Sequence, residues 1–512
     1  MPVKLLRTPT AGRRHHLPVL HLVPGLLLLL LSRSASASAS TVVTRLPGFD
    51  GPLPFYLETG YVGVEEETGT ELFYYFVESE RSPGTDPVIL WLTGGPGCSG
   101  FSGMVFEVGP INFVLAPYNG SLPQLVSNPY SWSKIASIIF LDSPVGSGFS
   151  YARDPKGYDV GDISSSSQVV TFLKKWFSDH PRYISNPFYL GGSSYAGKMI
   201  PVIAQYISQG NEQRRQPEIN LKGYLVGNPI TGSAFDDFNT KIPYAHGVGI
   251  ISDQLYEAAM ASCDGDYVTS VTKMCAGVLN TIQKLISEVD EGYILDDRCV
   301  RAAPKPVKDD ASRSRFLSEE QIQPTESSAD PTINCFSYRY YLSNIWANYN
   351  RTRDALKIKK GTIGKWVRCS SEFPYTHDVP SSIGYQFNLT TRGYRALVFS
   401  GDHDLLVPFL GTHAWIRSFN FSIVDNWRAW HVDGQSAGLS LSLLDFAFHF
   451  RPSLNIANPS MDYNPTEHPH SENQELHQSK HIKDTMLQHD GITYTHIDPG
   501  KREVLLHISL AN

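Results

Sequence analysis

The stretch Asn186-Pro-Phe-Tyr-Leu-Gly-Gly-Ser-Ser-Tyr-Ala-Gly-Lys198 decides the fold of this chain. Its apolar start predicts a buried strand, small residues follow, and a helical pattern continues beyond the last glycine. Ser194 stands at the centre of a Gly-x-Ser-x-Ala pattern in the turn between strand and helix. This strand–turn–helix context is typical of a sharp turn that exposes a nucleophilic serine. Because such a turn is tight, residues beside the serine must lack bulk, as Gly192, Ala196 and Gly197 do.

Other apolar segments predict further strands around this turn. Residues 88–93 form a continuous apolar run, as expected of a strand covered on both faces. Apolar residues at helical spacing predict a helix over 164–177. Strands that alternate with helices and carry loops at their carboxyl ends predict a mostly parallel sheet with helices on both faces. The remaining predicted strands are 71–77, 135–141, 221–228 and 394–400.

Two predicted strands lead directly into unusual loops. The strand at 88–93 is followed by Gly94-Gly-Pro-Gly-Cys-Ser-Gly100, and the strand at 394–400 by Gly401-Asp-His-Asp404. A glycine-rich loop after a buried strand can present backbone N–H groups to an anion, but a plain tight turn is an equal alternative on this motif alone.

The chain has 512 residues, 41% of them hydrophobic and 18% charged, which is an ordinary globular composition with ample core. Its formal net charge of −7 is mild. This balance argues against nucleic-acid binding and indicates no particular partner.

The first 40 residues have the pattern of a secretory signal. Arg13 and Arg14 precede an apolar run that ends in Leu26–Leu31, and Ser and Ala then alternate up to Ser40. A membrane anchor is the alternative, but the run is short and contains two prolines, which favours a cleaved signal. Four glycosylation sequons agree with secretion, at Asn119, Asn350, Asn388 and Asn420.

Six cysteines, an even number, suit disulfides in an oxidising compartment. No Cys-x-x-Cys occurs, so no zinc site is expected. Between residues 231 and 345 the pattern becomes helical and polar, and the stretch from Arg301 to Pro331 reads as a surface loop. We therefore expect a signal peptide at 1–40, a core at 41–230, an inserted lid at 231–345, a second core segment at 346–438, and an atypical, disordered or unrelated tail at 439–512.

Four ordered motifs show a resemblance to a known family. They are Trp91-Leu-Thr-Gly-Gly-Pro-Gly-Cys-Ser99, Leu141-Asp-Ser-Pro-Val-Gly-Ser-Gly-Phe-Ser-Tyr151, Gly192-Ser-Ser-Tyr-Ala-Gly197 and Ser400-Gly-Asp-His-Asp-Leu-Leu-Val-Pro408. Over roughly residues 44–438 the chain resembles the serine carboxypeptidase family, and especially its plant serine carboxypeptidase-like branch, which includes acyltransferases. The resemblance implies an α/β-hydrolase fold and a Ser…Asp…His triad in that chain order.

The resemblance also implies roles for individual residues. Ser194 matches the nucleophile and Asp404 the triad acid, while Asp402 is expected to shape the loop. The backbone N–H groups of Gly95 and Tyr195 match the oxyanion hole, which suits the chemistry because two fixed donors would face the developing negative charge. The family implies no cofactor or metal, a small-molecule acyl ester or a peptide as substrate, and a location in the secretory pathway, either vacuolar or extracellular.

By the same resemblance we expect one disulfide between Cys98 and Cys335, which would tie the glycine-rich loop to the insertion, and a local one between Cys263 and Cys275. Cys299 and Cys369 receive no assigned partner.

The chain departs from the peptidase pattern at two substrate-binding positions. Peptidases of the family grip the free carboxylate of their substrate with an Asn in the glycine-rich motif and an acidic residue just before the nucleophile. Here these positions hold Thr93 and Ser193. Thr93 also occurs in the acyltransferase branch, which moves acyl groups from glucose esters to alcohol acceptors. This favours an acyltransferase over a carboxypeptidase.

A second departure concerns the catalytic histidine. The family carries it in a Gly-Gly-His motif, yet residues 439–490 contain no glycine at all. His431 lies in family-like sequence but not at the triad position, so we expect it at the surface or at the edge of the pocket. Three readings remain open: an aberrant last exon of a working enzyme, an inactive relative that binds acyl ligands, or a base supplied by one histidine of the tail.

Overall fold

The computed structural model describes residues 40–232, 239–269, 272–297, 333, 335–370, 374–432, 434–444 and 505–511, the last of these by backbone alone. The expected signal segment up to residue 39 and the tail histidines from His449 to His489 lie outside the described residues. Within the described part, no helix is both long and apolar enough to cross a membrane.

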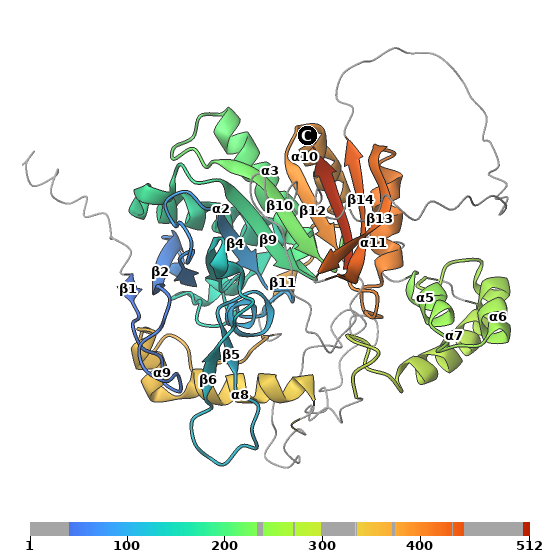
Figure 1. Ribbon diagram of the computed structural model, residues 1–512, viewed down its shortest axis with the longest axis horizontal. Helices are drawn as coiled ribbons and strands as arrows, with labels where there is room; N and C mark the ends of the chain where they lie inside the picture. Colours follow the sequence, from blue (N-terminus) through green and yellow to red (C-terminus); the bar gives the residue numbers. More distant parts are fainter. Residues whose placement is uncertain are drawn as a thin grey trace, which may run out of the picture. The chain divides into compact units, whose positions relative to one another are not determined.

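The described residues form one large mixed sheet of 11 strands, in the order β1-β2-β3-β7-β4-β9-β10-β12-β15-β14-β13 (Figure 1). Strands β7, β4, β9, β10 and β12 are parallel, as the alternating pattern predicts. The flanking pairs β1–β2, β2–β3, β3–β7, β12–β15 and β13–β14 are antiparallel. The strands are β1 Thr41–Val42, β2 Leu57–Glu65, β3 Thr70–Val77, β4 Val88–Leu92, β7 Ser137–Leu141, β9 Phe188–Ser193, β10 Leu221–Gly227, β12 Arg395–Phe399, β13 Ser422–Val432, β14 Gln435–Leu444 and β15 Leu505–Ala511.

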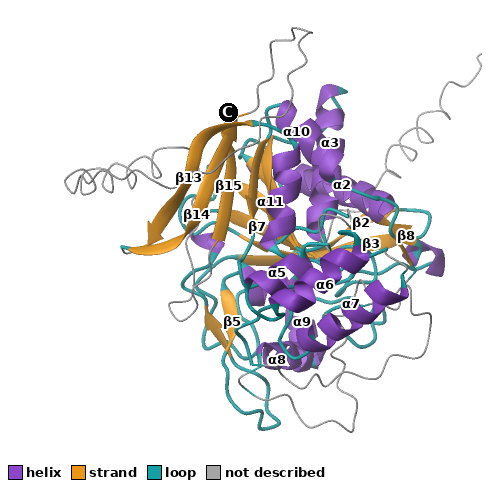
Figure 2. Cartoon of the chain, turned by 90° about the vertical axis from the view of Figure 1, so that its right-hand side faces the viewer, coloured by secondary structure: helices purple, strands orange, loops and turns teal. Residues whose placement is uncertain are grey.

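Besides the large sheet, the described residues form helices and two small sheets, which are joined by loops (Figure 2). One small sheet pairs β5 Ile111–Phe113 with β6 Leu125–Ser127, and the other pairs β8 Val160–Gly161 with β11 Tyr375–Thr376. The α-helices are α2 Asp162–Asp179, α3 Ala196–Glu212, α5 Lys241–Gly247, α6 Asp253–Cys263, α7 Lys273–Ile286, α8 Phe336–Asn348, α9 Asn350–Ala355, α10 Ile383–Thr391 and α11 Phe409–Ser418. Shorter helical turns are η2 Gly103–Glu107, η3 Trp132–Lys134, η4 Pro155–Tyr158 and η5 Pro181–Tyr183.

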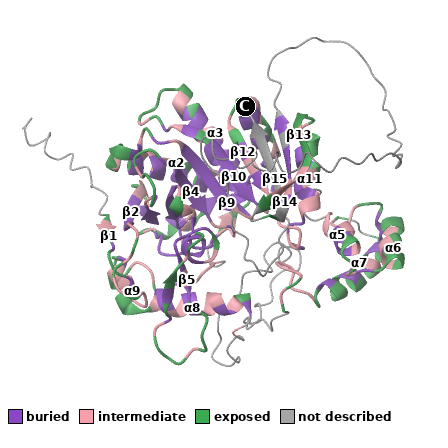
Figure 3. Cartoon of the chain, viewed as in Figure 1, coloured by how far each residue is buried: buried purple, intermediate pink, exposed green. Residues whose placement is uncertain are grey.

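The central strands of the large sheet are buried on both faces, as Figure 3 shows, whereas the edge strand β13 is largely exposed. Strand β3 shows how this arises, because side chains of a strand alternate between the two faces. Leu72, Tyr74 and Phe76 belong to a core shared with helices α2 and α3. Phe73 and Tyr75 belong to a second core shared with η2 and α8. The sheet is therefore covered on both sides, as an α/β-hydrolase fold requires.

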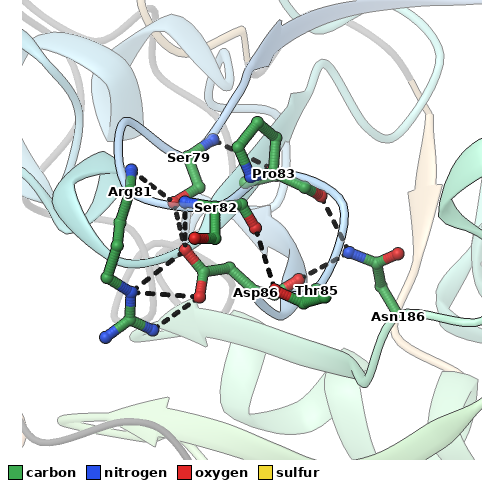
Figure 4. Close-up of polar contacts among 8 residues, drawn as sticks. Ser79, Arg81, Ser82, Pro83, Thr85, Asp86 and Asn186 are labelled. Atoms are coloured by element: carbon green, nitrogen blue, oxygen red, sulfur yellow. Dashed lines mark hydrogen bonds and ion pairs between the residues drawn. The ribbon is translucent and has the colours of Figure 1, made fainter.

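A polar cluster fixes the amino ends of β4 and β9 relative to one another (Figure 4). The side-chain amide of Asn186 donates to the carbonyl oxygens of Pro83 at 2.9 Å and Asp86 at 2.7 Å. The Asp86 carboxylate in turn accepts from the Ser79 hydroxyl at 2.6 Å and from Arg81 at 2.5 Å. The start of the strand that carries Ser194 is thereby anchored to the start of its neighbour.

The inserted region has a small core of its own. Buried residues of α5, α6 and α7 pack with Leu405, which belongs to the loop after β12. Cys263 and Cys275 form the disulfide that was predicted within this region. The structure thus shows a helical insertion, and its core reaches the loop that carries Asp404.

The sheet continues beyond the expected boundary at residue 438. Strand β14 runs to Leu444, and its residues Leu441 and Leu443 are buried in the main core. Residues 505–511 form β15, between β12 and β14. The expected end of the core at 438 is therefore too early, because the alternating leucines after Gly438 supply a buried strand face.

Candidate active site

Ser194 lies in the sharp turn between β9 and α3. Its φ of 57° falls in the left-handed region, which is uncommon for a residue other than glycine. Two backbone bonds hold this conformation: the Ser194 N–H donates to the Gly227 carbonyl at 2.9 Å, and its own carbonyl accepts from the Ile230 N–H at 3.0 Å. The serine is only partly buried. The turn thus leaves its hydroxyl within reach of a substrate.

The small residues beside the serine are required by their surroundings. A Cβ on Gly192 would lie 2.5 Å from the Leu92 carbonyl oxygen and 2.6 Å from the Cβ of Ala196. A Cβ on Gly197 would lie 2.4 Å from Pro229. These contacts are closer than packing permits, so the restriction on size inferred from the tight turn is met.

The glycine-rich loop after β4 lies against the serine. A Cβ on Gly94 would be 2.7 Å from the Cβ of Ser194 and 3.2 Å from its Oγ. Gly95 has a φ of 133°, which only glycine adopts readily. Among the described residues, the backbone N–H groups of Gly95 and Tyr195 donate no hydrogen bond to protein. Two unused donors beside the predicted nucleophile would suit the stabilisation of an oxyanion.

The buried carboxyl group of Asp142 fastens this loop from beneath. It accepts from the Ser99 hydroxyl, the Gly100 N–H and the Phe149 N–H, each at 2.7 Å. Gly148 leaves room for it, because a Cβ there would lie 2.1 Å from a carboxylate oxygen. Burial raises the pKa of Asp142 to about 7 despite these three hydrogen bonds. The Leu141–Tyr151 motif therefore supports the glycine-rich loop.

The predicted disulfide between Cys98 and Cys335 is wrong, because Cys98 is bonded to Cys369. The backbone explains this pairing. The Ser99 N–H donates to the Arg368 carbonyl at 2.7 Å, and the Ser370 N–H donates to the Gly97 carbonyl at 3.0 Å. This short antiparallel bridge sets the two cysteines opposite one another. Cys335 is disulfide-bonded too, and Cys299 lies outside the described residues.

Asp404 lies in the loop after β12, where its carboxylate is firmly held. One carboxylate oxygen accepts from the N–H groups of Leu406 at 2.7 Å and Val407 at 2.9 Å. The other accepts from the side-chain amide of Asn228 at 2.6 Å. Asn228 directly follows Gly227, whose carbonyl binds Ser194. The predicted nucleophile and the predicted acid are thus attached to the same end of β10.

The insertion contacts the acid loop through several groups. The Tyr244 hydroxyl donates to the Asp402 carbonyl at 2.5 Å. The N–H groups of Leu405 and Leu406 both donate to the Glu291 carbonyl at 2.9 Å. His403 lies 2.9 Å from the Asp402 carboxylate. These contacts agree with Asp402 as a loop-shaping residue.

Thr93 directly follows β4, and Ser193 ends β9 next to Ser194, so their role in substrate binding stays a prediction, while Glu107, which lies beside Ser193, was not predicted from the sequence. The Ser193 hydroxyl donates to Glu107 Oε2 at 3.4 Å, and the Trp91 ring N–H donates to the same oxygen at 2.5 Å. The Thr93 hydroxyl is buried and has no hydrogen-bond partner among the described residues. A glutamate in an otherwise apolar turn, Gly103-Met-Val-Phe-Glu107, was the signal that could have identified it.

The electrostatic setting of Glu107 is unusual. Desolvation by surrounding protein raises its pKa to about 7, against the opposing effects of Trp91, Arg368 and Ser193. The residue nevertheless remains exposed to solvent, which weakens this effect of desolvation. The guanidinium of Arg368 lies 3.8 Å from the ring centre of Tyr340. The carboxyl group of Glu107 thus lies 3.4 Å from the hydroxyl of Ser193, the residue directly before Ser194.

The histidines of the described residues leave the triad base unassigned. None of them hydrogen-bonds the Ser194 hydroxyl, and the Gly-Gly-His motif is absent from the sequence. His431 is exposed on β13, as expected. In the described part of the chain, no group of three or more His, Cys, Asp or Glu could hold a metal ion.

Comparisons with known proteins agree with this architecture. The crystal structure of KEX1(delta)p, a prohormone-processing carboxypeptidase from Saccharomyces cerevisiae, superimposes with a TM-score of 0.59 at 21% identity, covering 78% of this chain and 88% of that one, which supports the fold. Serine carboxypeptidase-like 7 of Arabidopsis thaliana is 46% identical over 81% of this chain and 88% of its own. Serine carboxypeptidase-like 16 of the same plant is 43% identical over 87% of this chain and 96% of its own. The sequence pattern of the serine carboxypeptidases matches residues 47–450, and the chain therefore belongs to the serine carboxypeptidase family.

Proposed function

We propose that this protein transfers an acyl group through an ester at Ser194, from a glucose ester to an alcohol acceptor. The observation that carries the proposal is the pair of positions beside the nucleophile. Thr93 and Ser193 stand where peptidases of the family use an Asn and an acid, and the Thr93 hydroxyl is buried. A site without that amide and acid lacks the two groups that grip a peptide's terminal carboxylate.

The chemistry follows from the arrangement of donors. The Ser194 oxygen attacks the carbonyl carbon of the donor ester, and the carbonyl oxygen takes the negative charge. The N–H groups of Gly95 and Tyr195 hold this oxyanion while the sugar hydroxyl leaves. The acceptor alcohol then attacks the Ser194 ester and releases the serine hydroxyl. Each half needs a group that takes the proton of the attacking hydroxyl and returns it to the leaving oxygen.

Because no residue is assigned to this proton transfer, a second candidate function has to be considered. Because the chain lacks Gly-Gly-His, it is alternatively a catalytically inactive relative that binds acyl ligands. Loss of one triad member leaves only oxyanion and binding effects, several orders of magnitude below the full rate. A fluorophosphonate reagent separates the candidates: rapid labelling of Ser194 supports an enzyme, and labelling no faster than that of a surface serine supports the binding protein.

An acyltransferase and a carboxypeptidase release different products, so a product assay distinguishes the two activities. The purified protein is incubated either with an acyl glucose ester and an alcohol, or with a blocked dipeptide at acidic pH. We expect a new ester from the first mixture and no free C-terminal amino acid from the second. Release of that amino acid at a rate above ester formation would overturn the transferase proposal. The Ser194→Ala variant is the control for both reactions.

Glu107 gives the reaction a distinctive pH dependence. Because the pKa of Glu107 is raised to about 7, its carboxyl group, 3.4 Å from the Ser193 hydroxyl, becomes negatively charged as the pH passes through 7. We expect Ser194 labelling to slow several-fold between pH 6 and pH 8 relative to Glu107→Gln, which stays neutral. Parallel pH profiles for the two proteins would exclude this role for Glu107.

We further infer that the protein enters the secretory pathway. The first 40 residues have the pattern of a cleaved signal, and the disulfides suit an oxidising compartment. Asn119, Asn350 and Asn420 are exposed, whereas Asn388 donates to Gln205 at 3.0 Å. Mass spectrometry of the protein from a eukaryotic host would test this, since an intact N-terminus without glycans would contradict it.

A further inference from the structure

Asn228 is held in a conformation that few residues adopt. Its φ is 40°, in the left-handed region. Asparagine, aspartate and glycine tolerate this region best. Its backbone N–H donates to the Phe399 carbonyl at 2.8 Å, which ties the end of β10 to the end of β12. The turn therefore brings the Asn228 side chain to the loop that carries Asp404.

Both the NH₂ group and the oxygen of the Asn228 side-chain amide form hydrogen bonds with that loop. Its NH₂ group donates to Asp404 Oδ2 at 2.6 Å, and its oxygen accepts from the Gly401 N–H at 3.3 Å. Only an amide offers a donor and an acceptor in this geometry. Aspartate at this position would keep the shape and the φ, but could not donate when ionised.

The same turn also holds the nucleophile. The Gly227 carbonyl accepts from the Ser194 N–H, and the Ile230 N–H donates to the Ser194 carbonyl. Asn228 stands between these two backbone contacts. Its side chain thus links the turn that binds the serine backbone to the carboxylate of the predicted acid.

We propose that Asn228 is a positioning residue, which sets the Asp404 carboxylate in register with Ser194; this rests on the proposed acyl transfer at Ser194. The backbone N–H groups of Leu406 and Val407 fix one carboxylate oxygen. Asn228 donates to the other oxygen, so it helps to set the rotation of the carboxylate plane. A carboxylate must be oriented before it can orient a catalytic imidazole.

Two substitutions separate positioning from folding. Asn228→Gly removes the amide and relieves the left-handed φ, so backbone strain does not confuse the result. Asn228→Asp replaces the donor with a carboxyl group at the same distance from Asp404. Two carboxyl groups so close share one proton at low pH and repel at high pH. This pair therefore creates a pH dependence that the native amide lacks.

Other titratable groups surround this pair and are the same in every variant. Asp402 and His403 lie in the acid loop, and Tyr244 reaches it from α5. Lys241 and Glu291 form an ion pair beside it at 2.7 Å. Their contribution cancels when pH profiles of the variants are divided by that of the native protein.

The test is the rate at which a fluorophosphonate labels Ser194 from pH 5 to pH 8. We expect Asn228→Gly to slow labelling about 10- to 100-fold, the effect of losing a hydrogen bond to a charged group. Asn228→Asp should approach the native rate near pH 5 and fall steeply as the pH rises. Lys357→Gly, exposed at the end of α9 and with a φ of 59°, is the matched control and should label at the native rate.

The outcomes distinguish this inference from the proposed function. If the native protein is labelled and the Asn228→Gly variant is labelled at the same rate, the positioning role is overturned and the acyl-transfer proposal stands. An absence of native labelling overturns acyl transfer, and a double-mutant cycle in urea then decides the inference. In that cycle, the changes in the free energy of unfolding caused by Asn228→Gly and Asp404→Ala are compared with the change in the double variant. A coupling energy between the two substitutions supports the proposed positioning contact, and strictly additive changes overturn it.

Discussion

Around Ser194 the chain is held by close backbone contacts, whereas the loop of Asp404 depends on the side chain of Asn228, directly after β10, and on the inserted helices. On the serine side, Gly94 and Gly192 allow two strands and a turn to approach more closely than a Cβ would permit. On the acid side, Asn228, Tyr244 and the Glu291 carbonyl supply separate hydrogen bonds. The first arrangement tolerates almost no change, while the second can lose one contact and keep the rest.

The largest effect is expected at Gly94. A Cβ there would lie 2.7 Å from the Cβ of Ser194 and 3.0 Å from the Ser193 carbonyl oxygen, so the loop or the turn must shift. A displacement of about 1 Å at a reacting group costs about 100-fold in rate. We expect Gly94→Ala to slow labelling of Ser194 by at least about that factor. Gly84→Ala, where a Cβ would meet nothing within 4 Å, is the control, and equal rates for both would break the comparison.

This contrast explains what could be predicted from sequence. The serine side is built from contiguous motifs, so Ser194 and the small residues beside it could be read directly from the chain. The disulfide of Cys98 could not be predicted, because it depends on a backbone bridge that sets Cys98 opposite Cys369, at a sequence separation of 271 residues. Glu107 was missed because its importance comes from Trp91 and Ser193, which only folding places beside it.

The second prediction concerns Asp142, which supports the serine side. Burial raises its pKa to about 7, so the folded state binds its proton more tightly than the unfolded chain does. Its contribution to stability is therefore full below about pH 4 and is lost as the pH rises to about 7, by on the order of 4 kcal/mol. Asp142→Asn does not titrate and should flatten this part of the profile.

The measurement is the free energy of urea unfolding between pH 4 and pH 7.5. Asp86 provides a control of opposite sign: burial opposes its ionisation, but hydrogen bonds from Arg81 and Ser79 outweigh burial and lower its pKa. Asp86→Asn should therefore cost more stability near neutral pH than at low pH. If Asp142→Asn and the native protein lose stability in parallel as the pH rises, the support assigned to Asp142 is wrong.

The third prediction tests whether the acid side can lose one contact. Tyr244→Phe removes the hydrogen bond to the Asp402 carbonyl but keeps the buried ring. We expect labelling of Ser194 to slow about 3- to 10-fold, and the free energy of unfolding to fall by about 1 kcal/mol. Tyr256→Phe, a partly exposed tyrosine of α6 in the same insertion, is the matched control. A loss as large as that of Gly94→Ala would remove the distinction between the two sides.

The smallest effect is expected at Thr93, on the serine side. Its hydroxyl is buried and has no hydrogen-bond partner among the described residues, so the folded protein gains nothing from it. Thr93→Val has nearly the same shape and should leave the free energy of unfolding unchanged or raise it by up to about 1 kcal/mol. If the hydroxyl instead turns to bind a substrate, KM for the acyl donor will rise while stability does not fall. A loss of stability without any change in KM would show that an unseen partner satisfies the hydroxyl, and would remove Thr93 from the substrate-binding residues.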